Sequence, residues 1–128
     1  MMLDWNDYRT QLAAGVKEIG QLSPDTIKGY MALSGAGHRT DLLGAKVREL
    51  IALAVAVTLR CDGCITVHTE AAIKHGATKE EIAEALGVAT SVNAGAALVY
   101  SARVMDAFRA YPRAASPHEP DSLANLRG

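Results

Sequence analysis

The stretch that decides the fold is ELIALAVAVTLRCDGCITVH, residues 49–68. Its first part, Leu50 to Leu59, is apolar except for Thr58. This run is about half the length needed to cross a bilayer. A helix that is apolar on nearly all sides belongs in the middle of a core. The first part therefore predicts a buried helix in a soluble protein.

The second part of the stretch carries the reactive side chains. A helix that begins at Cys61 or Asp62 places Cys61, Cys64 and His68 at positions i, i+3 and i+7, on one face. Unpaired N–H groups at the helix start favour a thiolate there. Because Cys64 and His68 are one turn apart, the imidazole can relay the thiol proton. The spacing therefore predicts a redox-active dithiol.

Glu49 is the second polar feature of the stretch. It borders the apolar run, and a carboxylate in such surroundings needs a partner. If the chain reverses between Leu59 and Asp62, Glu49 can face His68 or the cysteines and complete a proton path. The alternative is a surface carboxylate paired with Lys46 or with the surroundings of Arg48.

Composition limits the class of protein. The 128 residues fit one domain. Hydrophobic residues make up 49% and aromatic residues 5%, which favours closely packed helices over a β-sandwich. A formal net charge of -1, without a basic segment, argues against nucleic acid as a partner. Two cysteines and an N-terminus without a signal-like apolar run indicate a cytoplasmic protein.

Capping signals and apolar periodicity predict about six helices and no strand. Asp4 and Ser23 are expected to cap the first two helices, and Thr78 with Glu81 forms a capping box. SGAGHRT, residues 34–40, reads as a glycine-containing loop. The next helix is expected to be capped by Thr40 or Asp41. The first predicted helix runs from after Asp4 to about Leu22, the second from Pro24 to Leu33, and the third from the Thr40 or Asp41 cap to about Arg60. The fourth begins at Cys61 or Asp62 and ends near His75, where Gly76 terminates it. The last two cover residues 79–90 and Val92 to Tyr111.

Two structural alternatives compete with a redox role for the cysteines. A disulfide across CxxC closes a very short loop and constrains the unfolded chain little. A closed zinc site needs a fourth ligand beside two thiolates and His68. His38 is a candidate for it. His75 lies about 10 Å along the helix from His68, too far to share an ion.

Glu49, eleven further residues and then CDGCITVH together resemble the active-site signature of the carboxymuconolactone decarboxylase superfamily, in its alkyl hydroperoxidase D-like branch. The similarity extends from about Leu42 to Phe108. It implies an all-α fold of antiparallel helices in one domain, residues 1–111 with a site-bearing core over 40–110. It also implies trimers or hexamers. Residues 112–128 are expected to form a flexible tail or an arm on a neighbouring subunit.

The resemblance also implies a role for each matching residue. Cys64 corresponds to the nucleophile that attacks a hydroperoxide, and Cys61 to the resolving cysteine. Glu49 and His68 correspond to the proton relay. The peroxidase branch has a second histidine where this chain has Gly63, a departure that bears on the efficiency of peroxide reduction.

The sequence thus predicts a thiol-dependent peroxidase or disulfide oxidoreductase of the peroxiredoxin type, an antioxidant enzyme. It is expected to need no metal, flavin or haem, and to take a hydroperoxide and an external thiol donor. The first alternative is decarboxylation of a carboxymuconolactone-type acid, using cationic groups among His68, His38, Arg39 and Arg48. The second is a non-enzymatic, metal-binding helical oligomer. No membrane partner is expected.

Overall fold

The protein is described from a computed structural model, and the structure describes residues 1–113. Its contacts divide the chain between Ser91 and Val92 into two compact units. The expected single domain over 1–111 stays a prediction. The expected tail over 112–128 lies outside the described residues from 114 onward.

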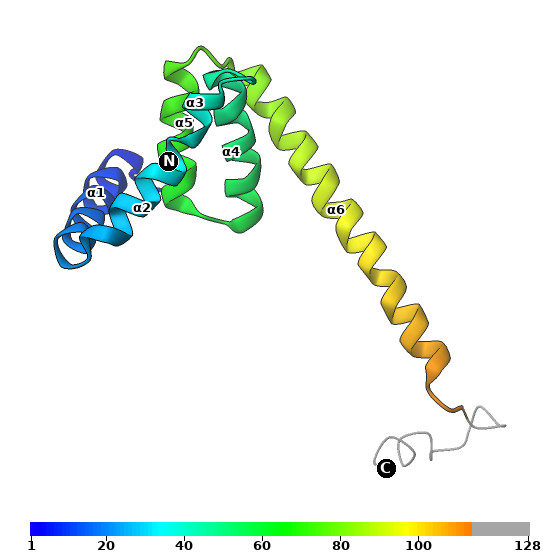
Figure 1. Cartoon of the computed structure of the whole chain (residues 1–128). Helices are drawn as coiled ribbons and strands as arrows, with labels where there is room; N and C mark the ends of the chain where they lie inside the picture. Colours follow the sequence, from blue (N-terminus) through cyan, green and yellow to red (C-terminus); the bar gives the residue numbers. More distant parts are fainter. Residues whose placement is uncertain (114–128) are drawn as a thin grey trace. The chain divides into compact units, whose positions relative to one another are not determined.

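The described residues form six α-helices and no strand, which confirms the all-α prediction (Figure 1). In chain order the helices are α1 (Trp5–Leu22), α2 (Pro24–Ser34), α3 (Ala36–Thr40), α4 (Ala45–Leu59), α5 (Asp62–Lys74) and α6 (Lys79–Ala110).

The first two helices begin where the sequence predicts. The Asp4 carboxylate accepts a hydrogen bond from the Asp7 N–H at 3.1 Å, which caps α1. Ser23 precedes α2, but its hydroxyl bonds to that of Thr26 at 2.7 Å and caps no backbone N–H. Pro24 in the first turn therefore sets this start by its fixed backbone angle.

The connection to α4 differs from the prediction. The expected glycine-containing loop over 34–40 contains α3, so that interpretation was wrong. Asp41 lies in the left-handed region with φ 44° and ends α3, so neither Thr40 nor Asp41 caps α4. Gly44, at φ 80°, occupies that position. Aspartate tolerates the left-handed conformation, and Arg48 holds its carboxylate at 2.7 Å.

A tight reversal joins α4 to α5. Arg60 lies in the left-handed region with φ 54°, and the Cys61 N–H donates to the Ala56 carbonyl at 3.1 Å. As a result, α4 and α5 pack side by side (Figure 1). The predicted start at Cys61 or Asp62 and the left-handed Gly76 after α5 are both confirmed.

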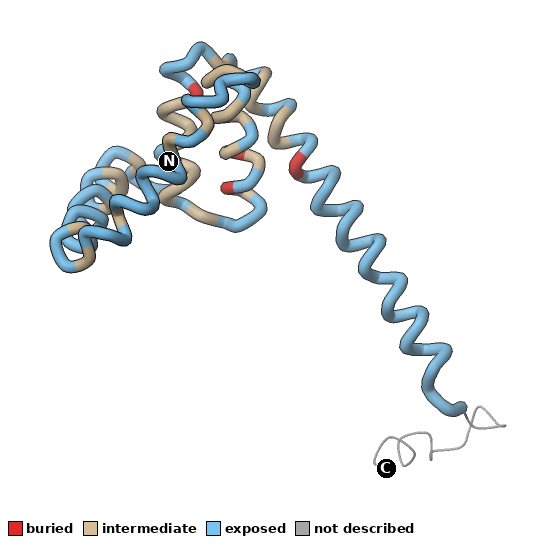
Figure 2. Tube along the Cα trace, viewed as in Figure 1, coloured by how far each residue is buried: buried red, intermediate tan, exposed pale blue. Residues whose placement is uncertain are grey.

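Small side chains make up the buried core. Leu53 and Ala56 of α4 and Thr66 and Ala72 of α5 are buried, as is Ala89 of α6 (Figure 2). α1 packs against both α2 and α5, and residues of α1 and α2 line a pocket together with the start of α5.

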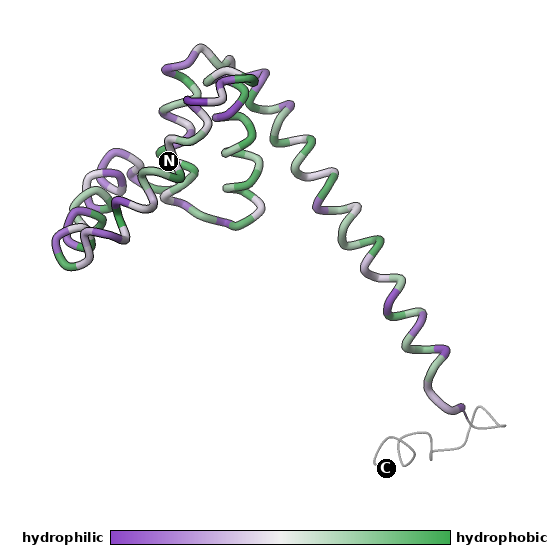
Figure 3. The backbone as a smooth tube through the Cα atoms, viewed as in Figure 1, coloured by the Kyte–Doolittle hydropathy of each residue, from purple (hydrophilic) through white to green (hydrophobic). Residues whose placement is uncertain are grey.

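One face of α4 stays uncovered. The helix is hydrophobic along most of its length (Figure 3). Val47, Ile51, Val55 and Leu59 follow one another at intervals of four, and each is exposed. The prediction that Leu50 to Leu59 is buried on all sides is therefore wrong for the single chain. We call these four residues the α4 stripe.

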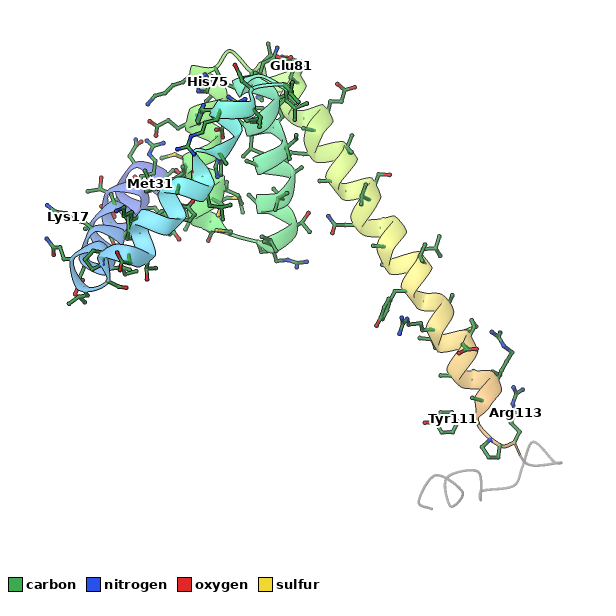
Figure 4. The ribbon with its side chains drawn as sticks, in the orientation of Figure 1. Lys17, Met31, His75, Glu81, Tyr111 and Arg113 are labelled. Atoms are coloured by element: carbon green, nitrogen blue, oxygen red, sulfur yellow. The ribbon has the colours of Figure 1, made fainter. Side chains whose placement is uncertain are left out.

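α6 replaces the two helices predicted over 79–90 and from Val92 to Tyr111. The Thr90 hydroxyl donates to the Leu86 carbonyl at 2.9 Å, inside the helix, and so does not cap a new helix after it. The predicted capping box is confirmed by reciprocal bonds between Thr78 and Glu81, at 2.9 and 3.0 Å. Figure 4 labels Glu81 at this start, and its carboxylate also binds Lys46 at 2.8 Å.

The second unit begins at Val92, and the helix that the structure describes in it is the remainder of α6, up to Ala110. Its large apolar side chains, including Leu98, Met105 and Phe108, are exposed (Figure 2). Of the helices that the structure describes, α6 alone is long and apolar enough to cross a membrane by length and composition. Core helices of soluble proteins meet the same criterion.

Candidate active site

The two cysteines lie at the start of α5. Cys61 is the N-cap residue, in extended backbone conformation, and its Sγ accepts a hydrogen bond from the Cys64 N–H at 3.2 Å. Cys64 lies inside the first helical turn. Both thiols are free and half-buried. The local sequence therefore uses a sulfur atom where serine or aspartate commonly caps a helix.

The two thiols have opposite acidities. The side chain and backbone N–H of Cys64 act as hydrogen-bond donors and lower the pKa of Cys61, against the opposing effects of burial and the Asp62 charge. The Cys61 side chain, followed by burial, raises the pKa of Cys64. When the two adjacent thiols hold a single proton between them, their titration belongs to the pair and not to either residue. The capping geometry then favours the negative charge on Cys61.

Glu49 and His68 meet across the contact between α4 and α5. A Glu49 carboxylate oxygen lies 2.7 Å from Nδ1 of His68, and both side chains are partly buried. The structure thus brings together the two residues that the sequence could only suggest as neighbours. With Nδ1 held by the carboxylate, Nε2 is the nitrogen available to a proton from the site. We call Glu49 and His68 the relay pair.

The rival partners of Glu49 are engaged elsewhere. Lys46 binds Glu81 at 2.8 Å, and Arg48 binds Asp41 at 2.7 Å. The alternative interpretation, in which Glu49 pairs with Lys46 or with the surroundings of Arg48, is therefore wrong.

The thiols open into an apolar cleft of about 450 Å³. We call it the dithiol cleft. His68 lines it together with both cysteines, so the imidazole of the relay pair borders the same space as the sulfur atoms. Its other walls come from α1, α2 and α5: Arg9, Leu12, Ala13, Val16, Ile27, Tyr30, Gly63 and Val67.

Gly63, the position where the sequence departs from the peroxidase branch, lies close to α1. A Cβ atom at residue 63 would lie 3.0 Å from Cδ2 of Leu12 in α1. The end of the Leu12 side chain would thus have to shift by a few tenths of an ångström to admit a side chain at residue 63. Sequence reasoning did not place Leu12 at the site. The apolar periodicity of α1 through Tyr8, Leu12 and Val16 was the one signal that this face packs inward.

The remaining histidines lie apart from the dithiol cleft. His38 Nδ1 is 3.3 Å from the Arg48 guanidinium, and neither residue lines the cleft. His75 follows the last turn of α5 (Figure 4). Within residues 1–113, no group of three or more His, Cys, Asp or Glu side chains is arranged to hold a metal ion.

A CxxC helix start and a carboxylate–imidazole pair on two packed helices define an all-α dithiol protein. The chain belongs to the carboxymuconolactone decarboxylase family, whose sequence model matches residues 24–107. That span contains Glu49, both cysteines and His68. The resemblance to this superfamily is therefore confirmed.

Individual relatives agree with this assignment. An uncharacterised protein of Haemophilus influenzae is 44% identical over 108 residues, which cover 84% of this chain and 96% of the relative. Another, of Cupriavidus necator, is 31% identical over 86% of this chain and 97% of its own length. The apo crystal structure of a carboxymuconolactone decarboxylase family protein from Legionella pneumophila matches with a TM-score of 0.66 and 31% identity. That match covers 82% of this chain and 94% of the other.

Proposed function

We propose that the protein is a thiol-dependent peroxidase, a disulfide oxidoreductase of the peroxiredoxin type that reduces hydroperoxides with its CxxC dithiol. The observation that carries the proposal is the position of the dithiol: Cys61 and Cys64 share the dithiol cleft with His68, which Glu49 holds at 2.7 Å. Thiolate, second thiol and proton acceptor are the groups that such a reaction needs.

The chemistry proceeds in three balanced steps. One thiolate attacks the peroxide, so that an S–O bond forms and the O–O bond breaks, and the departing alkoxide takes up the proton that the thiol had released and leaves as an alcohol. The second thiol displaces hydroxide from the resulting sulfenic acid, which gives the Cys61–Cys64 disulfide and water. An external thiol donor then returns two electrons and two protons by thiol–disulfide exchange. The family resemblance assigns the first attack to Cys64.

Decarboxylation of a carboxymuconolactone-type acid is the second candidate, favoured by the family to which the chain belongs. It needs cationic groups around a substrate carboxylate. Of the cations considered for it, His38, Arg39 and Arg48 do not line the dithiol cleft, where Arg9 is the lining arginine. Arg9 already binds Glu70 at 3.2 Å. The site therefore supports the dithiol reaction better.

We further propose that the protein works as a homo-oligomer, trimer or hexamer, in the cytoplasm. The α4 stripe and the apolar residues after Val92 are exposed in the single chain. A lone helix cannot bury its own apolar side chains, and a contiguous exposed apolar face is typical of an interface. Self-association would cover both surfaces.

Mass spectrometry of the purified, reduced protein tests the proposed activity. One equivalent of an organic hydroperoxide is expected to remove two hydrogens, with the new disulfide mapped to Cys61 and Cys64. Turnover with dithiothreitol as the donor should follow. Thiols that stay reduced in excess peroxide would contradict the peroxidase and direct attention to the decarboxylase.

A further inference from the structure

We infer that the dithiol reacts with hydroperoxides that carry a long hydrocarbon chain, and that this chain lies in an apolar groove along α1. The inference rests on the proposed function and deepens it, since a small hydroperoxide needs no such groove. We call this surface the α1 groove. Its lining residues are Tyr8, Gln11, Leu12, Gly15, Val16 and Ile19.

The α1 groove continues the dithiol cleft. Leu12 and Val16 line both spaces, and they lie one helical turn apart where two neighbouring faces of α1 meet. Leu12 also lies beside the dithiol, because a Cβ atom on Gly63, between the two cysteines, would be 3.0 Å from its Cδ2. A molecule whose peroxide group reaches the sulfur atoms therefore extends along Leu12 and Val16 into the α1 groove.

The lining of the α1 groove suits a hydrocarbon chain. Val16 and Ile19 expose large apolar side chains there, and Gly15 leaves space between them because it has no side chain. None of the lining residues that the structure describes carries a charge. The Gln11 amide already donates to the Asp7 carboxylate at 2.7 Å. A chain placed in the groove removes apolar surface from water on both sides of the contact, which favours binding.

The dimensions match a chain and exceed what hydrogen peroxide needs. The dithiol cleft measures about 450 Å³ and the α1 groove about 380 Å³, each within the range of small-molecule sites. From Leu12 to Ile19 the helix advances about 10 Å, which is comparable to an extended octyl chain. The peroxide group and the start of the chain would occupy the cleft, and the rest of the chain the groove.

α1 lies outside the part of the chain that the family model matches. That match begins at residue 24, after α1 ends at Leu22. The dithiol and the relay pair thus lie within the matched span, while α1 adds its own residues to the wall of the cleft. These residues are Arg9, Leu12, Ala13 and Val16. The helix is therefore placed to select among hydroperoxides without carrying the reacting groups.

Straight-chain hydroperoxides of increasing length test the inference. The reduced protein is mixed with butyl, octyl or dodecyl hydroperoxide, each below its critical micelle concentration, and quenched mass spectrometry follows the disulfide. Each reaction converts the dithiol and one hydroperoxide into the disulfide, an alcohol and water. We expect the second-order rate constant to rise about tenfold from butyl to octyl, because a half-exposed chain gains about half the effect of full burial per methylene group. It should level off at dodecyl, whose chain exceeds the groove.

Gly15→Gln is the variant that fills the α1 groove. A Cβ atom at Gly15 meets nothing within 4 Å, so a neutral polar side chain enters the groove without a clash. The helix is preserved, because glutamine is a better helix former than glycine. Gly29→Gln is the matched control, since Gly29 has the same free space and lines neither the groove nor the cleft. The ratio of the octyl to the butyl rate constant should fall about fivefold in Gly15→Gln and stay unchanged in Gly29→Gln.

Equal rate constants for butyl and octyl hydroperoxide, or the same fall in Gly29→Gln, would overturn the inference and leave the peroxidase intact. An octyl preference that survives in Gly15→Gln, with a changed molecular mass by light scattering, would also overturn it and assign the α1 groove to a second copy of the chain. If none of the three hydroperoxides forms a disulfide, the proposed function itself fails.

Discussion

The Glu49 carboxylate and Nδ1 of His68 lie 2.7 Å apart, on two different helices. The pair depends on the packing of α4 against α5, while the dithiol depends on α5 alone. This difference allows the relay pair to be removed without disturbing the CxxC helix start.

Glu49→Gln should therefore slow peroxide-driven disulfide formation while the thiols remain present and reactive. The glutamine keeps a hydrogen bond to His68 but not the charge that stabilises its protonated form. We expect a loss on the order of 10²-fold, at the lower end of general acid–base contributions. Stopped-flow fluorescence of Trp5, or quenched mass spectrometry, measures the rate. Glu80→Gln, on an exposed position of the same unit, is the matched control, and an equal loss there would contradict the relay.

The opposite acidities of the two thiols predict distinct pH profiles of alkylation. Iodoacetamide reacts with thiolates, so the rate at each cysteine rises through that cysteine's pKa. Because the pKa of Cys61 is lowered, its rate should reach a plateau at a lower pH than the rate of an ordinary cysteine. The pKa of Cys64 is raised, so its rate should still be rising at a pH where that of Cys61 has reached its plateau. Both profiles are measured in the wild-type protein by mass spectrometry of the two alkylation sites after brief labelling, since each cysteine sets the acidity of the other. Overlapping profiles would contradict a thiolate held mainly on Cys61.

Leu12 and Gly63 should be coupled in stability. Gly63→His, which introduces the residue of the peroxidase branch, is expected to displace Leu12 and lower the free energy of unfolding by about 1–3 kcal/mol, the usual cost of overpacking. In a Leu12→Ala background the loss should be smaller, because the added side chain gains room. Urea denaturation provides the four values of the cycle. Gly29→His is the control, since a Cβ atom at Gly29 meets nothing within 4 Å.

Thr66 offers a test of the core between the helices. Its hydroxyl is buried and has no hydrogen-bond partner in the part of the chain that the structure describes. Thr66→Val replaces it with a methyl group of similar size, so the free energy of unfolding should rise by about 1 kcal/mol. Thr90→Val should lower it, because the Thr90 hydroxyl bonds to the Leu86 carbonyl. A destabilised Thr66→Val protein would indicate a partner for this hydroxyl.

Self-association predicts a specific response of the unit after Val92. Light scattering on the wild-type protein should give the mass of a trimer or hexamer. Leu98→Asp combined with Phe108→Asp should weaken assembly on the order of 100-fold or more, because burying an unpaired carboxylate costs several kcal/mol. Asp106→Ala, at an exposed charged position, is the control. A monomeric wild-type protein that sediments with phosphatidylcholine vesicles would instead assign α6 to a membrane.

Local signals predicted most of the helix boundaries. Asp4, Pro24, Gly76 and the Thr78–Glu81 box act within a few residues, so the sequence alone identifies them. The boundary expected near Val92 was wrong because Thr90 and Ser91, which often precede a helix, lie within α6. α3 was missed because a helix of five residues has too little periodicity to detect.

The site was predictable only in part, for a related reason. The stripe of Cys61, Cys64 and His68 follows from helical spacing within α5. The contact of Glu49 with His68 depends on the reversal at Arg60, and that of Leu12 with Gly63 joins residues far apart in the chain. Spacing does not encode either contact. The acidity difference between the cysteines likewise depends on the capping bond at Cys61, which the spacing does not reveal.

The continuity of α5 also sets the phase between the dithiol and the relay pair. One residue inserted between Cys64 and His68 would turn the two cysteines by about 100° around the helix axis relative to His68. His68 would keep its contact with Glu49, and the two cysteines would keep their spacing and their helix start. Disulfide exchange and proton supply could thus be uncoupled by a single added residue, leaving a protein that still exchanges thiols but no longer times the proton to the broken O–O bond.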